Sequence, residues 1–232
     1  MKYKLDNYLD QLITKKLVFQ QEDRASSGKL SASKLYWPLQ WQILATQFSL
    51  KSNFDDYTLR KFQRGHDVED WFIKQIEPKE KQKFLEYRGA IGYCDSIVDT
   101  ANWDNPVGCI PLEVKSVTNA KFKRLKGIAD KGHILQNAFY AMAFKSEYHA
   151  ITYIASDDYR ISTGIYKTKD SKVEIDKIID DFERALESKT IPVFEPREKW
   201  QGNIKYNNFP DFAGLSAQEL QEKYNELKNG YL

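Results

Sequence analysis

Residues 87–115 constrain the fold most, because two segments rich in β-forming residues flank a run of turn-forming residues at 102–108. Side chains alternate between the two faces of a strand, so Glu113 and Lys115 in the second segment share a face. In a hairpin with a suitable register, Asp95 in the first segment lies beside Glu113. The sequence therefore predicts a β-hairpin on which two carboxylates and a lysine converge.

Asp95, Glu113 and Lys115 together suit one kind of chemistry. Two neighbouring carboxylates repel each other unless a cation neutralises them, and hard oxygen ligands of this type favour Mg²⁺ or Mn²⁺. A bound metal ion polarises a phosphate oxygen and lowers the pKa of a bound water, while Lys115 orients that water or stabilises developing negative charge. Hydrolysis of a phosphodiester is the reaction that this combination fits best.

Two further motifs flank the hairpin. Gly65-His66-Asp67-Val68-Glu69 precedes it, and Gln136-Asn137-Ala138-Phe139-Tyr140 follows it. Together with Asp95 and the Glu113-x-Lys115 motif, they resemble in order and spacing the PD-(D/E)XK nuclease superfamily, in particular the branch that contains RecB-type and lambda-type exonucleases. The resemblance covers residues 65–140, and the flanking segments match only loosely.

The resemblance implies an α/β fold with a restriction-endonuclease-like core, in which helices flank a central mixed β-sheet and a helical segment comes first. It implies that Asp95, Glu113 and the carbonyl of Val114 bind Mg²⁺ or Mn²⁺, and that Lys115 activates the attacking water. The residues that it places in catalysis are Glu69, Asp95, Glu113, Lys115, Gln136 and Tyr140.

An amphipathic pattern predicts a helix over 57–76, ended by Pro78. His66 and Glu69 are three residues apart on this helix and share a face, which places Glu69 within reach of a metal ion on the hairpin. Taken alone, Glu69 is a solvated helix acid, whereas the other motifs favour a ligand role, either direct or through water. His66 is either a further metal ligand or a partly buried histidine with satisfied hydrogen bonds, and the sequence leaves both open.

The clearest helix is predicted over 130–145, with one face of apolar residues that pack and a second stripe that contains Gln136 and Tyr140. By the resemblance, these two side chains hydrogen-bond near the scissile bond or position Lys115. The alternative is that they are amphipathic residues at the edge of the core. His133, on the same stripe, is a weaker candidate for a phosphate contact.

Five cations follow the hairpin within eleven residues: Lys121, Lys123, Arg124, Lys126 and Lys131. Beside a metal site they can hold a phosphate backbone, an interaction that weakens with salt, although a solvated basic loop is the alternative. The whole chain has a net charge of only +2, so a nucleic-acid site depends on such local clustering.

At 232 residues the chain suits one nuclease domain. We expect an N-terminal helical segment over 1–56 with a first helix inside 1–21, a catalytic core over 57–190 and a C-terminal extension over 191–232. In the core, a loop is expected at 78–84, strands at 149–155 and 160–167, and a helix at 173–187. Ser216 and Glu219 form a capping box that predicts a terminal helix.

Cys94 and Cys109 are too few for a four-cysteine iron–sulfur cluster, so we expect none. Free thiols are the expectation for a cytoplasmic protein, and a disulfide across the hairpin is the alternative. The N-terminal residues do not form a signal peptide, and no apolar window has the length of a membrane span, which also predicts a cytoplasmic location, in a bacterium, a phage-infected cell or another host.

The sequence therefore predicts a metal-dependent nuclease that hydrolyses DNA, preferably an exonuclease of recombination or repair, with a phage as a plausible source. Its partner would be linear duplex or single-stranded DNA, and a homo-oligomer and a single-strand-annealing or recombination partner stay open. The alternatives are a restriction-type endonuclease, a catalytically idle nucleic-acid-binding module on the same fold, or a protein-interaction domain.

Overall fold

The computed structural model describes residues 11, 15–17, 27–51, 55–125, 127–203 and 207–230. Most of the helix expected inside 1–21 therefore lies outside the described residues. Within them, no helix is long and apolar enough to cross a membrane.

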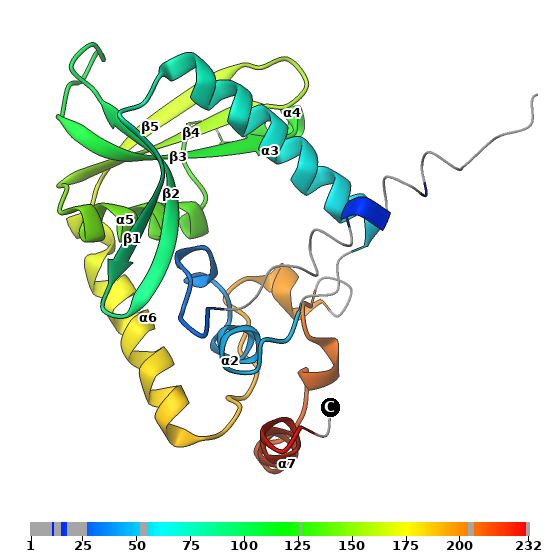
Figure 1. The fold of residues 1–232 in the computed structure, drawn as a ribbon. Helices are drawn as coiled ribbons and strands as arrows, with labels where there is room; N and C mark the ends of the chain where they lie inside the picture. Colours follow the sequence, from blue (N-terminus) through cyan, green and yellow to red (C-terminus); the bar gives the residue numbers. More distant parts are fainter. Residues whose placement is uncertain are drawn as a thin grey trace, which may run out of the picture.

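A five-stranded mixed sheet forms the centre of the fold (Figure 1). Its strands are β1 (Glu80–Tyr87), β2 (Ala90–Asp99), β3 (Cys109–Val117), β4 (Tyr148–Ala155) and β5 (Ile161–Lys167). They lie side by side in chain order; β3 and β4 are parallel, and the other neighbours are antiparallel. The parallel pair needs a crossover, which α4 (Asn119–Leu125) and α5 (Lys131–Phe144) provide. The predicted α/β fold with a mixed sheet flanked by helices is confirmed.

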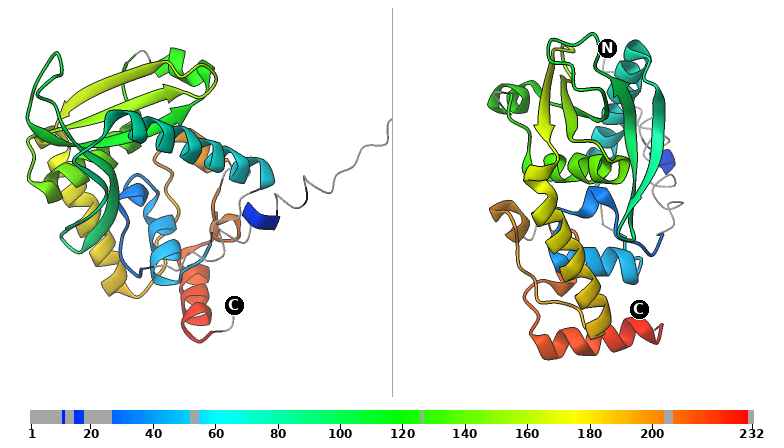
Figure 2. Two further views of the ribbon diagram at one scale, coloured as in Figure 1. Left: turned by 45° about the horizontal axis from the view of Figure 1, so that its top comes forward. Right: turned by 90° about the vertical axis from the view of Figure 1, so that its left-hand side faces the viewer.

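Helices cover the two faces of the sheet differently (Figure 2). On one face α3 (Asp56–Ile76) packs on the middle of the sheet, where Val68 and Phe72 join Leu112 and Val114 in an apolar cluster. On the other face α5 packs on the sheet, and α6 (Lys169–Ser188) packs on α5. The site motifs on α3 and α5 are thus carried on opposite faces of the sheet.

Of the two site helices, α3 has clear start and stop signals, and α5 is tied to the sheet. The Asp55 side chain accepts a hydrogen bond from the Thr58 N–H at 2.8 Å and caps α3, which ends at Glu77, in the left-handed conformation, before Pro78. In α5, the side-chain amide of Asn137 donates to the Ala150 carbonyl at 2.5 Å and so ties the helix to β4. The predicted α3 and α5 are both confirmed, to within a residue or so at each end.

The N-terminal and C-terminal segments build a second apolar cluster beside α6. It combines α2 (Leu39–Gln47) with α7 (Ala217–Lys228) and the short turns η2 (Lys199–Gly202) and η4 (Pro210–Phe212) around the buried Trp41. The capping box predicted at Ser216 is present: its hydroxyl accepts from the Glu219 N–H, and the Glu219 carboxylate accepts from the Ser216 N–H. Before α2, the short η1 (Ala32–Lys34) packs against β2.

One expectation about the core is wrong. Residues 78–84 are not a loop, because 80–84 begin β1, which forms a tight hairpin with β2. Arg88 and Gly89 both have positive φ at this turn, which is the geometry of a two-residue hairpin, but arginine is not a residue that signals it. The strand is charged because it is an edge strand with one face in solvent. In the basic run, Lys121, Lys123 and Arg124 lie in α4, so the alternative of a solvated loop does not describe this part of it.

Candidate active site

The candidate site lies where β2 and β3 separate, here named the β2–β3 fork. The two strands pair from Asp99 opposite Cys109 to Ser96 opposite Leu112, and beyond that point β2 stays with β1 while β3 stays with β4. Just past the paired residues, the Val114 N–H donates to the Asp95 carboxylate at 2.8 Å. The Asp95 side chain thus replaces a main-chain partner, which fixes its carboxylate at the opening of the sheet.

The backbone is distorted at the fork, which explains why β2 does not alternate cleanly in sequence. Cys94 and Ile97 are three residues apart, yet both pack into the apolar cluster on the α5 side. Gln82, opposite Asp95 in β1, has a left-handed φ of 47°. Regular alternation therefore stops between Cys94 and Ile97, at the position where Asp95 must reach β3.

Glu113 is the most buried acid of the site, with 1% of its side chain exposed. Its Oε1 accepts a hydrogen bond from the Gln136 side-chain amide at 2.6 Å and forms an ion pair with Lys115 Nζ at 2.5 Å. Its Oε2 is buried and has no hydrogen-bond partner among the described residues. An ionised carboxylate with a buried, unsatisfied oxygen is unfavourable unless a cation or a water contacts that oxygen.

The electrostatics of the fork follow from burial and from like charges. Burial, followed by the neighbouring charge of Asp95, raises the pKa of Glu113 to about 8. Burial also raises the pKa of Asp95, although Lys115 and the Val114 N–H oppose the shift. Burial alone would lower the pKa of Lys115, but Glu113 and Asp95 outweigh it and raise the pKa, so the lysine is a cation at neutral pH. The site is therefore short of positive charge.

The α3 residues reach the edge of this group. His66 Nδ1 lies 3.7 Å from Glu69 Oε2, and their side chains are 56% and 22% exposed. The charge of Glu69 acts on Asp95 and Glu113, which places it near the fork. However, no three His, Cys, Asp or Glu side chains of the described residues are grouped as a metal site, so Glu69 and His66 do not complete a ligand set with the two fork carboxylates here.

Gln136, on the face of α5 that also carries Tyr140, holds Glu113 in place. Gln136 donates to Glu113 and also, at 3.3 Å, to the hydroxyl of Tyr140, which is itself buried. Burial and then the Glu113 charge raise the pKa of Tyr140, so the hydroxyl stays neutral. Gly92 makes this contact sterically feasible: a Cβ at that position would lie 2.7 Å from Tyr140 Cε1 and 2.8 Å from the Ala32 Cβ. Gly92, Gln136 and Tyr140 are therefore a packed unit behind Glu113.

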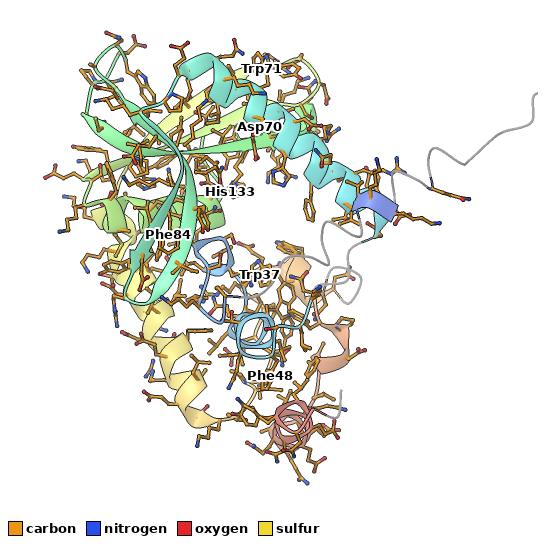
Figure 3. The ribbon with its side chains drawn as sticks, in the orientation of Figure 1. Trp37, Phe48, Asp70, Trp71, Phe84 and His133 are labelled. Atoms are coloured by element: carbon orange, nitrogen blue, oxygen red, sulfur yellow. The ribbon has the colours of Figure 1, made fainter. Side chains whose placement is uncertain are left out.

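Two nearby residues, His133 and Tyr153, form a contact that the sequence patterns did not predict. His133 Nδ1 lies 2.7 Å from the Tyr153 hydroxyl, and burial, followed by Lys115 and Lys121, lowers its pKa to about 3. His133 is thus neutral at neutral pH and cannot pair with a phosphate as a cation. In Figure 3 it lies between α3, labelled at Asp70, and Trp37 of the segment after η1. Nothing in the sequence distinguishes Tyr153 on β4 from any other tyrosine in a strand.

The basic run is partly neutralised. Lys121 Nζ lies 2.5 Å from the Asp130 carboxylate, and Lys131 Nζ lies 2.8 Å from that of Glu174. Lys123 and Arg124 are exposed in α4. Lys126 lies outside the described residues. Of the four predicted cations that the structure describes, two are thus ion-paired and two present exposed side chains on one short helix.

The donor set at the fork fits a divalent cation. Asp95 and Glu113 are hard oxygen donors with raised pKa values and one unsatisfied carboxylate oxygen, so a cation would relieve both their repulsion and their burial. Mg²⁺ needs only one or two protein carboxylates, because it keeps several of its own waters.

Both cysteines are free: Cys94 is buried and Cys109 half-buried.

Comparisons with known proteins identify the fold. No protein-family model matches the chain, and no curated protein sequence matches it. Among solved structures, the crystal structure of SSO0001 matches 90% of this chain and 98% of its own, with 15% identity and a TM-score of 0.56. An alkaline exonuclease (LHK-Exo) from Laribacter hongkongensis matches over 75% of this chain and 93% of its own, with 14% identity and a TM-score of 0.52. LHK-Exo in complex with dAMP matches over 69% and 89%, with the same identity and TM-score.

Proposed function

We propose that the chain is a metal-dependent nuclease that hydrolyses phosphodiester bonds of DNA from its ends, in recombination or repair. The observation that carries the proposal is the fork itself, where buried Glu113 has an ion-paired oxygen beside Lys115, an unsatisfied oxygen, and Asp95 as its neighbour. The fold supports it, because a structure that shares this fold is described as an alkaline exonuclease and another is a complex with dAMP.

Asp95 and Glu113 would hold Mg²⁺ or Mn²⁺, with the Val114 carbonyl as a further ligand and Glu69 contributing through water. When bound, the ion supplies a polarised phosphate oxygen and a more acidic water. His66 would support Glu69 through the contact of its Nδ1, which lies 3.7 Å from the Glu69 carboxylate. Gln136 fixes the rotamer of Glu113 by its 2.6 Å hydrogen bond, and Tyr140 packs behind Gln136.

Lys115 acts as a cation in this scheme. Its raised pKa keeps it protonated at neutral pH, so it orients the attacking water by donating a hydrogen bond and stabilises the charge that develops on the phosphate. It does not accept the proton of the water in this state. Lys123 and Arg124 in α4 would bind the phosphate backbone of the same strand.

The test is degradation of end-labelled linear DNA and closed circular DNA by the full chain with Mg²⁺, with Mn²⁺ and with EDTA. Glu113→Gln and Lys115→Met keep the size of each side chain and remove its charge. Lys223→Met is a matched control, because Lys223 forms a lysine–glutamate pair with Glu226 at 2.7 Å in α7. We expect the wild type and Lys223→Met to degrade linear DNA in a metal-dependent way and to spare circular DNA. Glu113→Gln and Lys115→Met should degrade neither.

The other outcomes separate the alternatives. Cleaved circles would indicate a restriction-type endonuclease on the same site. DNA binding without cleavage under either metal would indicate a catalytically idle module. Full activity of Glu113→Gln would contradict the assignment of the fork as the active site.

A further inference from the structure

Phe84 on β1 and Tyr93 on β2 form an exposed aromatic pair that the proposed chemistry does not use. The two residues are direct partners in the β1–β2 register, and their ring centroids are 5.3 Å apart with an interplanar angle of 60°. They are 48% and 58% exposed, although large aromatic side chains are usually well covered. Figure 3 labels Phe84 on the ribbon that β1 and β2 form.

The pair lies on the strand face that leads to the fork. Cys94 is buried against the α5 side, so Tyr93, which precedes the distortion, lies on the other face of β2. The electrostatic interactions of Asp95 with Glu69 and His66 of α3 place Asp95 on that side as well. Tyr93 and Asp95 are two residues apart, which in a strand corresponds to about 7 Å, or roughly the reach of one nucleotide.

The chemistry of this surface suits the face of a base better than a phosphate. Flat aromatic rings stack on any nucleobase, at a gain of about 1–3 kcal/mol per base, and need no hydrogen-bond code. Lys83, the cation next to Phe84 in sequence, lies instead over the ring of Phe144, which belongs to α5 on the opposite side. The aromatic pair is thus left to bind an apolar, planar group next to Asp95.

We propose that Phe84 and Tyr93 form a stacking platform for an unpaired base beside the scissile phosphate, and this rests on the nuclease function proposed above. In an intact duplex each base is stacked and paired, so only a single strand or a frayed end can place a base there. The substrate class that follows is DNA with a single-stranded end. A blunt duplex end is then degraded only as fast as it frays.

The test measures binding apart from cleavage. A short single strand with 2-aminopurine at its end is titrated with the full chain in EDTA, and degradation of the same strand and of a blunt duplex is then measured with Mg²⁺. The variants are Tyr93→Ala and Tyr93→Leu, Phe84→Ala, and Tyr93→Trp, which keeps a ring. Tyr159→Ala is the matched control, since Tyr159 forms an exposed aromatic contact with Trp71, at 4.6 Å between centroids.

We expect the wild type, Tyr93→Trp and Tyr159→Ala to quench the 2-aminopurine, and Tyr93→Ala and Phe84→Ala to bind the single strand roughly tenfold more weakly. Their KM for single strands rises while kcat changes little. Thermal melts of each variant check that it is folded.

Unchanged quenching and binding in folded Tyr93→Ala would overturn the platform, even if Mg²⁺-dependent cleavage is present. An equal preference of the wild type for blunt and single-stranded ends would overturn the substrate class. Quenching without any cleavage in the wild type would support the platform and contradict only the nuclease function.

Discussion

At the scale of single residues, Glu113 is held by partners that come from different elements. Lys115 shares its strand and Gln136 comes from α5, and both contact Oε1. The geometry of the carboxylate therefore depends on these two side chains, while Asp95 across the fork adds a neighbouring negative charge that raises the pKa of Glu113. Removal of a partner should therefore change catalysis more than it changes folding.

Replacement of Gln136 tests this dependence. Gln136→Leu keeps the volume but leaves Glu113 Oε1 with Lys115 as its remaining partner. Loss of a hydrogen bond to a buried charge costs about 1–3 kcal/mol, so we expect kcat to fall about tenfold or more, with KM nearly unchanged. Tyr140→Phe is the control, because it removes only the 3.3 Å bond to Gln136 and should lower kcat much less. Equal kcat values for Gln136→Leu and the wild type in steady-state assays would contradict this role.

A second prediction at the scale of single residues concerns Gly92. In Gly92→Ala the new methyl group would lie within 3 Å of both Tyr140 and Ala32, and neither is the end of a flexible chain. Overpacking of this kind costs about 1–3 kcal/mol. We expect urea unfolding to show that loss, together with weaker activity, because Tyr140 supports Gln136. Gly89→Ala offers a contrast at an open turn, where strain from positive φ alone acts. A Gly92→Ala protein as stable as the wild type would show that the close approach is not real.

At the scale of elements, β4 carries a buried histidine that makes stability depend on pH. His149 is fully buried, packs on Tyr166, and has two ring nitrogens without hydrogen-bond partners among the described residues. Burial lowers its pKa to about 4, from 6.5. Between these values the unfolded chain binds a proton that the folded chain does not, so stability is complete above about pH 6.5 and is lost as pH falls towards 4.

His149→Phe removes this titration while keeping a ring at the position. The wild type should lose on the order of 3 kcal/mol of unfolding free energy through His149 between pH 7 and pH 4, and the variant should lose that much less. Urea unfolding at a series of pH values measures the difference between the two proteins, which cancels the other titrating groups. Parallel pH profiles would show that the histidine is not buried as a neutral group.

A further prediction at this scale concerns DNA binding by the exposed cations of α4. If Lys123 and Arg124 each contact a phosphate, Lys123→Gln combined with Arg124→Gln should reduce the slope of log K against log salt by roughly 1.4–1.8, at about 0.7–0.9 per contact. Lys131→Gln is the control, because Lys131 is ion-paired with Glu174 and should change the slope less. Binding in EDTA by fluorescence anisotropy measures both. The same slope in all three proteins would exclude α4 from the DNA-binding surface.

Sequence patterns predicted the elements that follow simple periodicity or carry caps. The helices α3, α5 and α6 and the strands β4 and β5 belong to this class. The edge strand β1 was missed because its solvent-exposed face makes it as charged as a loop. That Glu113 and Lys115 share a face was predicted from strand alternation. The hydrogen bond from Gln136 to Glu113 and the distortion at Asp95 depend instead on tertiary packing across the fork. The ion pairs of Lys121 and Lys131 depend on Asp130 and Glu174, which no local pattern connects to them.

At the scale of the whole molecule, a metal ion at the fork should be coupled to folding. An ion that binds only the folded state stabilises it by about 2.7 kcal/mol when its free concentration is a hundred times Kd. For a chain of this size we expect Mg²⁺ or Mn²⁺ to raise Tm by about 5–10 °C relative to EDTA. Glu113→Gln should show little or none of this rise, while Lys223→Met should show all of it. A rise of equal size in Glu113→Gln would place the ion elsewhere.

The fork also leaves one edge of β2 without β3, and the chain covers it with an earlier segment. The Ile91 N–H donates to the Leu30 carbonyl at 2.9 Å, and Ser31 forms an isolated parallel bridge with Ile91. Two residues thus shield an open strand edge of the kind that recruits strands from other molecules. A protein shortened to begin at Ser33 would keep every strand of the sheet and yet expose that edge, and we expect it to aggregate where the longer chain stays dispersed. For anyone choosing boundaries for expression, Leu30 and Ser31 are part of the folded core.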